Sequence, residues 1–342
     1  MTLTLNSHLV EPTADAPVSH ALIEQALFEV KRLIVGQDYT LERLLIALLA
    51  KGHVLLEGVP GLAKTAMIKS LAQVVGGTFG RIQFTPDLVP ADLTGTRIYN
   101  GKTGEFTTEL GPMFVNLLLA DEINRAPAKV QSALLEVMQE RQITIGKQTY
   151  VVPDPFLVLA TQNPIESDGT YALPEAQVDR FMFKVLVDYP TYDDELVVIT
   201  RMTGPEIGLH TLLTPRLLKE MQDAVARVYV DPRVIAYAAT LISATRKPAD
   251  HGLAQLGKSI QFGASPRASI NLILGARALA FLRGRQYALP QDVAEIAPDV
   301  IRHRLVLTYA GIASGVTSET ILAALLGRFP PPRIDLGDRY AS

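Results

Sequence analysis

Short apolar runs alternate with helical patterns between residues 53 and 188 of this chain. The runs at 53–56, 114–120, 156–160 and 181–187 are too apolar for strands that expose one face to water. Such runs predict a buried, mostly parallel sheet. The run at 81–84 alternates between polar and apolar residues, which predicts a strand at the edge of that sheet. Strands that alternate with helices in this way indicate an α/β fold.

Helical periodicity dominates on both sides of this region. Apolar residues between Leu22 and Leu33 recur at helical spacing after the candidate cap Ser19, and a second helix is expected at about 38–50. After Tyr189 and Pro190 the composition changes. Helices are then expected at 193–203, 215–226, 231–245, 265–283, 290–306 and 317–327. The second half of the chain is therefore predicted to be helical.

These patterns divide the chain into five parts. We expect a flexible arm at 1–18, an α/β core at 19–190, a helix and linker at 191–214, a helical domain at 215–328 and a tail at 329–342.

Two hairpin signals interrupt the core. Segments 96–99 and 105–108 flank an Asn-Gly-containing turn, and segments 142–145 and 148–152 flank Gly146 and Lys147. The pattern alone leaves open whether these hairpins are surface decoration or functional inserts.

Composition excludes several classes of function. The 342 residues carry a net charge of −3, so the chain has no bulk attraction to nucleic acid or to anionic membranes. The absence of cysteine rules out disulfides, thiol catalysis and Cys-based zinc sites. No apolar run approaches the roughly 18 residues of a membrane span, and the start lacks a secretory signal pattern. A cytoplasmic location is therefore expected.

A glycine-containing turn between the first predicted strand and a helix is the strongest chemical signal. It comprises Gly58, Val59, Pro60, Gly61, Leu62, Ala63, Lys64 and Thr65, and Ala66 continues into the helical pattern. Backbone N–H groups and a helix N-terminus form a phosphate cradle in such a turn, with Lys64 reaching the outer phosphates and Thr65 offering a hydroxyl to Mg²⁺. Ala63 stands where the pattern G-x-x-x-x-G-K-[ST] has glycine. We expect Ala63 to begin the helix in a right-handed conformation. The alternative is an ordinary Gly/Pro turn.

Polar side chains follow two of the predicted strands. Asp121 and Glu122 end the apolar run at 114–120, where Asp121 could hold Mg²⁺ through water beside Thr65 and Glu122 could polarise an attacking water. Asn163 follows the run at 156–160. In a doubly wound sheet it would lie between Asp121 and the glycine-containing turn at 58–65, which we call the phosphate loop. The alternatives are a strand that ends in solvated acids and an Asx-Pro turn.

Two arginines are candidates for contact with phosphate. Arg180 lies between Asp179 and an apolar run, which suggests either a local ion pair or a guanidinium presented to a neighbouring subunit's γ-phosphate. Arg267 follows the cap Ser265 and Pro266 in the first turn of a helix, where its charge opposes the helix dipole.

Together these motifs resemble the MoxR family of AAA+ ATPases, in order and spacing, from about residue 20 to residue 328. The segments that carry the resemblance are 58–65, 121–127, 160–164, 173–181 and 263–268. The resemblance implies an α/β fold with a five-stranded αβα core, a helix-2 insert, a pre-sensor-1 hairpin and a helical lid, with ATP between core and lid.

The resemblance also implies roles for individual residues. Val35, Gly36 and Gln37 would lie against the adenine, and Asn163 matches sensor 1. Arg180 matches the arginine finger, and Arg267 matches sensor 2 and could reach a neighbour's nucleotide. Arg125 could line a subunit interface.

The implied function is Mg²⁺-dependent ATP hydrolysis by a homo-oligomeric ring, most simply a hexamer. Such a ring would remodel or mature a client protein, often one with a von Willebrand factor A domain. Two alternatives are a nucleic-acid motor, for which the chain has no basic stripe, and a nucleotide-binding scaffold with little turnover.

Overall fold

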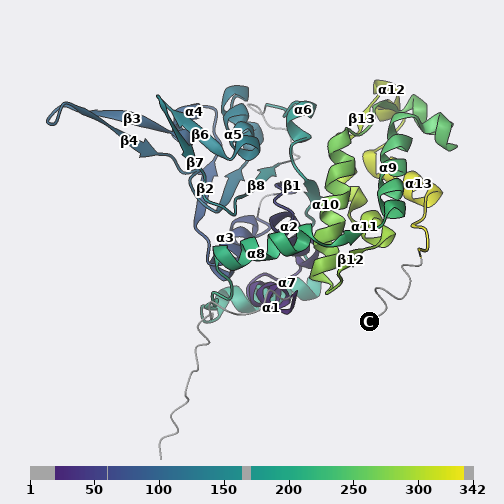
Figure 1. Ribbon diagram of the computed structural model, residues 1–342, viewed down its shortest axis with the longest axis horizontal. Coiled ribbons are helices and arrows are strands. Elements are labelled where there is room, and N and C mark those ends of the chain that lie inside the picture. The colour runs from purple at the N-terminus through teal and green to yellow at the C-terminus, as the bar shows by residue number, and fades with distance from the viewer. Residues whose placement is uncertain (1–19, 60, 164–170, 335–342) are drawn as a thin grey trace, which may run out of the picture.

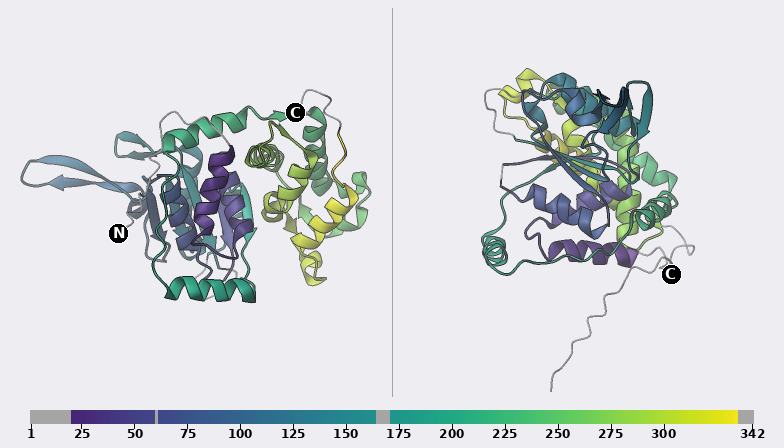
Figure 2. Two further views of the ribbon diagram at one scale, coloured as in Figure 1. Left: turned by 90° about the horizontal axis from the view of Figure 1, so that it is seen from below. Right: turned by 90° about the vertical axis from the view of Figure 1, so that its left-hand side faces the viewer.

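The computed structural model describes residues 20–59, 61–163 and 171–334, which form an α/β core beside a helical domain (Figures 1 and 2). A five-stranded parallel sheet in the order β2-β5-β8-β1-β9 lies at the centre of the core. Its strands are β1 (Val54–Glu57), β2 (Phe79–Gln83), β5 (Leu117–Asp121), β8 (Leu157–Gln162) and β9 (Phe183–Leu186). The predicted parallel sheet is confirmed, with β2 at an edge and β8 between β5 and β1.

Helices cover both faces of this sheet. Successive side chains of a strand point to opposite faces, so Leu56 and Leu119 pack in one apolar cluster whereas Leu55 and Leu118 pack in another. The first cluster includes side chains of α1 (His20–Lys31), α2 (Asp38–Leu49) and α3 (Lys64–Val74), and the second those of α5 (Ala128–Glu140). Shorter helices are α4 (Pro90–Thr94), η1 (Ile123–Arg125) and α6 (Glu175–Val178). Burial on both faces explains why the central strands are apolar at nearly every position.

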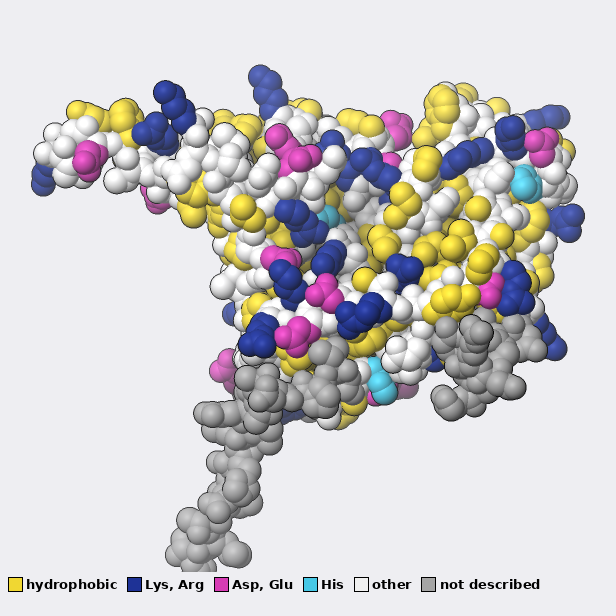
Figure 3. Space-filling view, in the orientation of Figure 1, with side chains coloured by type: hydrophobic (Ala, Val, Ile, Leu, Met, Phe, Trp, Pro, Cys, Tyr) yellow, Lys and Arg dark blue, Asp and Glu magenta, His cyan; other side chains and the backbone are white. Residues whose placement is uncertain are grey.

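The two predicted hairpins are confirmed. The longer one, β3 (Gly95–Asn100) with β4 (Glu105–Leu110), projects from the core (Figure 2), and the shorter one is β6 (Gln142–Ile145) with β7 (Gln148–Val151). Tyr99 and Phe106 face each other across the longer hairpin, with ring centroids 5.1 Å apart, and both are more than half exposed. Apolar side chains are therefore displayed along this projection (Figure 3).

The second half of the chain is mainly helical, as predicted. Its α-helices are α7 (Tyr192–Thr203), α8 (Pro215–Ala226), α9 (Pro232–Arg246), α10 (Pro266–Leu282), α11 (Pro290–Ile301), α12 (Tyr309–Ala313) and α13 (Ser318–Arg328). Short 3₁₀ turns are η2 (Pro248–His251), η3 (Ala254–Lys258) and η4 (Arg302–Arg304). Two small strand pairs also occur, β10 (Tyr229–Val230) with β12 (Tyr287–Ala288) and β11 (Ile260–Phe262) with β13 (Val306–Leu307).

One predicted helix, 290–306, was too long. The helix α11 ends at Ile301, η4 follows, and Val306 and Leu307 pair with β11. The side chains of η4 turn toward the core, and this tertiary contact ends the helix earlier than its apolar periodicity suggests.

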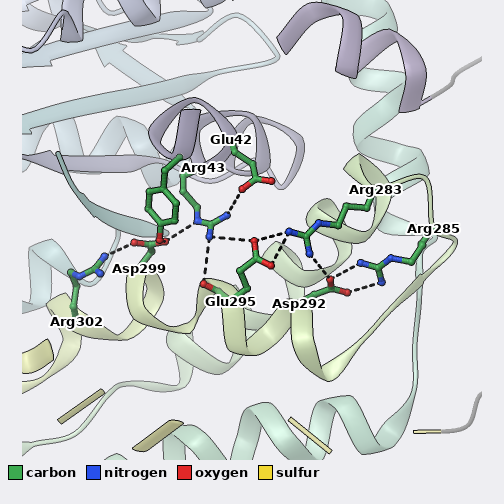
Figure 4. Close-up of polar contacts among 9 residues, drawn as sticks. Glu42, Arg43, Arg283, Arg285, Asp292, Glu295, Asp299 and Arg302 are labelled. Carbon is green, nitrogen blue, oxygen red and sulfur yellow. Dashed lines mark hydrogen bonds and ion pairs between the residues drawn. The ribbon is translucent and has the colours of Figure 1, made fainter. Parts of the chain in front are cut away.

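A buried ionic network joins the core to the helical domain (Figure 4). Arg43 on α2 donates through Nε to Oδ2 of Asp299 on α11 at 2.8 Å, and both side chains are almost completely buried. Asp299 also accepts from the hydroxyl of Tyr39 and pairs with Arg302. Burial, followed by the Asp299 carboxylate, raises the pKa of Tyr39 to about 12, so this hydroxyl remains a donor. The network therefore connects α2 to α11, and the buried charge of Arg43 is balanced by that of Asp299.

The turn η4 covers the outer edge of the sheet at β9. Arg302 donates to the backbone carbonyl of Lys184 at 2.5 Å, and Arg304 donates to that of Phe181 at 2.6 Å. On its other side β9 is tied to β1 through an ion pair of 2.8 Å between Lys184 and Glu57, the last residue before the phosphate loop.

Candidate functional site

A cavity of about 520 Å³ opens at the carboxyl end of the sheet, where the phosphate loop, β5 and β8 meet. It is lined by Gly58, Gly61, Leu62, Ala63, Lys64, Thr65, Ala66, Arg81, Gln83, Asp121, Glu122, Thr161 and Asn163. All of these residues belong to the core. The predicted phosphate loop, strand-end acids and Asn163 therefore share one cavity, whereas ATP was expected between core and lid.

The conformation of the phosphate loop corrects the expectation for Ala63. This residue precedes the helix α3 as its N-cap and lies in the left-handed region, with φ 54° and ψ 22°. Gly61 also has a positive φ, of 89°. A left-handed conformation is costly for a residue with a Cβ, by about 1–3 kcal/mol. A left-handed residue next to a right-handed one turns successive backbone N–H groups toward the same side of the chain. Such groups form concave sites that bind anions. Pro60 lies outside the described residues.

Lys64 begins α3 and points into the loop. Its Nζ donates to the carbonyl of Gly58 at 2.6 Å. Partial burial lowers the pKa of Lys64, while the carboxylates of Asp121, Glu122 and Glu57 oppose that shift. Lys64 is thus a cation held where anionic oxygens would enter the cavity.

Asp121 is fixed by side chains from both neighbouring strands. Thr161 on β8 donates to Oδ1 of Asp121 at 2.7 Å, and Arg81 on β2 donates to Oδ2, also at 2.7 Å. Neither Arg81 nor Thr161 was predicted from the sequence as a site residue. The signal for Arg81 was its place in the alternating edge strand, two residues before Gln83, since both side chains then point the same way.

Glu122 follows directly in a left-handed conformation, with φ 56°. Its backbone N–H donates to the hydroxyl of Thr161 at 2.8 Å, and its carboxylate pairs with Nε of Arg125 at 2.7 Å. The interaction with Thr161 therefore links the positions of the two acids.

Val35, Gly36 and Gln37 are absent from the lining of this cavity, as is the described residue Val59. Gln37 is buried, and its Nε2 donates to the carbonyl of Asp188 at 3.2 Å. Gly36 has a positive φ of 70° and lies against the side chain of Asp194. The adenine contact implied for these residues stays a prediction.

Arg180 and Arg267 also lie away from the cavity. Together with His53, Met138 and Gln139 they line a separate hollow of about 110 Å³. Arg180 donates to the carbonyl of Leu135 at 2.8 Å, and Arg267 is half exposed and pairs with Asp179 at 3.2 Å. The structure therefore brings the two arginines to one surface, separate from the phosphate loop of the same chain.

The oxygen atoms around Asp121 suit a hard cation. Within the described residues, no group of three or more His, Cys, Asp or Glu side chains is placed to hold a metal alone. Thr65 and Asp121 offer one hydroxyl and one carboxylate to the same cavity. Mg²⁺ typically takes one or two protein oxygens together with water and phosphate oxygens, so these residues fit Mg²⁺ that arrives with a nucleotide.

None of the helices described here has the length and apolarity needed to cross a membrane.

Comparisons with known proteins agree with this geometry. Residues 53–183 match the model of the ATPase family associated with various cellular activities (AAA), and residues 256–325 match that of the AAA lid domain. "Chaperone MoxR1" of Mycobacterium tuberculosis is 52% identical, over 97% of this chain and 90% of its own length. "Protein MoxR" of Paracoccus denitrificans is 34% identical, over 85% of this chain and 90% of its own. A crystal structure of a putative ATPase from Cytophaga hutchinsonii superposes with a TM-score of 0.87 at 46% identity, covering 92% of this chain and 96% of that one.

Proposed function

Because the chain belongs to the MoxR family of AAA+ ATPases, we propose that it hydrolyses ATP to ADP and phosphate in the cavity above the phosphate loop. The observation that carries the proposal is the convergence of Lys64, Asp121, Glu122 and Asn163 on that cavity. A cation, two acids and a polar amide beside a phosphate cradle are the groups that phosphoryl transfer to water requires.

Binding comes first. The loop amides and Lys64 hold the phosphates, while Thr65 and Asp121 would hold Mg²⁺. Bound there, Mg²⁺ supplies charge neutralisation to the phosphate oxygens. The left-handed Ala63 and Gly61 keep the loop amides directed inward, so little reorganisation is needed when the anion arrives.

The chemical step uses the remaining side chains. Water attacks the γ-phosphorus, the bond to the bridging oxygen breaks, and ADP leaves with that electron pair. Glu122 accepts the proton of the water, and Asn163 orients it. Arg125 pairs through Nε with one oxygen of the Glu122 carboxylate, Oε2, at 2.7 Å in this structure.

The position of Arg180 supports a site completed by a second subunit. Arg180 and Arg267 line a hollow apart from the cavity of their own chain. We propose that they reach the nucleotide of a neighbour in a ring, most simply a hexamer. A trans arginine contributes roughly 10³–10⁵ in rate in other phosphoryl-transfer enzymes.

The projecting hairpins support a role on other proteins. The half-exposed aromatic pair Tyr99 and Phe106 lies on a ribbon that reaches beyond the core. We propose that the ring remodels or matures a client protein, in line with the chaperone name of its relative. A client or adaptor with a von Willebrand factor A domain is the partner implied by the family resemblance.

The test is ATP turnover per subunit against protein concentration, with mass measured on the same samples. Turnover that rises as rings form supports a site shared between subunits. Turnover that stays constant while the mass shifts would refute the shared site, although not the ATPase. If neither the wild-type chain nor the chain with a client turns over ATP, the protein is a nucleotide-binding scaffold.

The Glu122→Gln variant isolates the chemical step. It should bind ATP as the wild type does and fail to hydrolyse it, because the amide cannot accept the proton. Normal turnover of this variant would remove Glu122 from its assigned role.

A further inference from the structure

The carboxylate of Asp121 is engaged on both oxygens by the chain itself. Oδ1 accepts from the hydroxyl of Thr161, and Oδ2 accepts from Nη2 of Arg81, each at 2.7 Å. The acid assigned above to the metal is therefore already neutralised by a guanidinium. A cation that approaches Asp121 therefore meets the positive charge of Arg81 beside Oδ2.

The edge strand β2 places Arg81 at the cavity. In the register of β2 with β5, Gln83 lies beside Asp121, and Arg81 lies beside Leu119. Arg81 and Gln83 both line the cavity, and Nη2 of Arg81 also donates to Oε1 of Gln83 at 2.9 Å. Both described partners of this guanidinium, Gln83 and Asp121, thus line the phosphate cavity.

A purely structural role explains this arrangement poorly. The Arg81 side chain is 47% exposed, and ion pairs of such exposure add little to stability. Within the described part of the chain, its Nε and Nη1 groups donate to no acceptor. These remaining donors form the planar fork that suits phosphate oxygens.

Resting on the proposed ATPase function, we propose that Arg81 is a further phosphate-binding residue that exchanges partners. It neutralises Asp121 while the cavity holds no nucleotide, and it donates to the terminal phosphate of ATP when Asp121 serves the metal. ADP lacks that phosphate. Arg81 therefore contributes to the preference of the site for ATP over ADP.

The experiment compares the affinities of a non-hydrolysable ATP analogue and of ADP at saturating Mg²⁺, by calorimetry on the full chain. Arg81→Met should weaken binding of the ATP analogue about tenfold, the scale of one charge-assisted hydrogen bond, and should not weaken binding of ADP. Arg81→Lys, which keeps the charge without the fork, should give an intermediate loss.

Arg216→Met is the matched control, because Arg216 is also a surface arginine in an ion pair, with Glu220 on α8. It should leave both affinities unchanged. If Arg81→Met weakens ATP analogue and ADP equally, or neither, the proposal is wrong. A wild-type chain that binds neither nucleotide would instead refute the proposed function itself, so the two failures are distinct.

Discussion

At the scale of the residue, the cavity is lined by two residues whose backbone conformations sequence preference disfavours. Ala63 and Glu122 both carry a Cβ, and both lie in the left-handed region, at φ 54° and 56°. Left-handed conformations of this kind cluster at functional sites, where the surrounding structure holds them in place. Of the four non-glycine residues with a positive φ in the described part of the chain, these two face the cavity, and the other two, Lys51 and Arg141, lie elsewhere.

A buried histidine gives the fold a predictable response to acid. His53 lies directly before β1, where its ring accepts from the N–H of Val158 at 3.0 Å and donates to the carbonyl of Met138 at 3.1 Å. Burial, followed by the charge of Arg141, lowers the pKa of His53 to about 3. Below its unfolded pKa of about 6.5 the unfolded chain binds a proton that the folded chain does not. The free energy of unfolding should therefore fall by about 1.4 kcal/mol per pH unit from this residue between pH 6.5 and pH 3.

Denaturant unfolding between pH 7 and pH 5 measures this slope. In the His53→Gln variant, the slope of the unfolding free energy against pH should correspond to about one proton fewer taken up on unfolding. His210→Gln, at an exposed position, is the control for the loss of a histidine as such. An unchanged slope in the His53 variant would show that another group governs the response.

At the scale of the element, the sequence predicts those strands and helices whose limits are set by local periodicity. The five strands, both hairpins and the long helices follow from apolar runs, turn residues and caps. Periodicity does not predict the end of α11 at Ile301 or the two-residue strand β13, because contacts with distant segments set both. The same limit applies to the site. The loop and strand-end acids carry motifs, whereas Arg81 enters the cavity only through the pairing of β2 with β5.

The junction between α2 and α11 should be sensitive to the loss of one charge. Asp299 is fully buried between Arg43 and Arg302. Asp299→Asn leaves these two guanidiniums without their shared carboxylate, and removal of one partner of a buried pair typically costs about 3–5 kcal/mol. We expect a loss of this size in the free energy of unfolding, with the helical domain and the core melting in separate transitions.

Calorimetry and denaturant titration measure both effects. Asp38→Asn is the matched control, because Asp38 pairs with Lys31 at an exposed position of the same helix α2. Its loss should stay below about 1 kcal/mol. A comparably small loss for Asp299→Asn would show that the network contributes little to the junction.

At the scale of the whole molecule, the separation of the arginines from the cavity determines how chains can cooperate. If Arg180 acts on a neighbour, Arg180→Ala should lower turnover roughly 10³-fold or more with ATP affinity retained. Mixing that variant with Glu122→Gln chains should restore part of the turnover, because the intact cavity of one chain then meets the intact Arg180 of the other. A mixture as inactive as its components would place Arg180 in its own site.

The turn η4 has a further consequence for how this chain is made. Arg302 donates to the carbonyl of Lys184 on β9 and Arg304 to that of Phe181 just before the strand, and both arginines lie more than a hundred residues after these partners. During synthesis, the core segments therefore leave the ribosome well before Arg302, which donates to the edge strand β9. An unpaired edge strand is a template for pairing with other chains. The helical domain thus ends a period in which the nascent core is open to aggregation, in addition to any part it takes in the catalytic cycle.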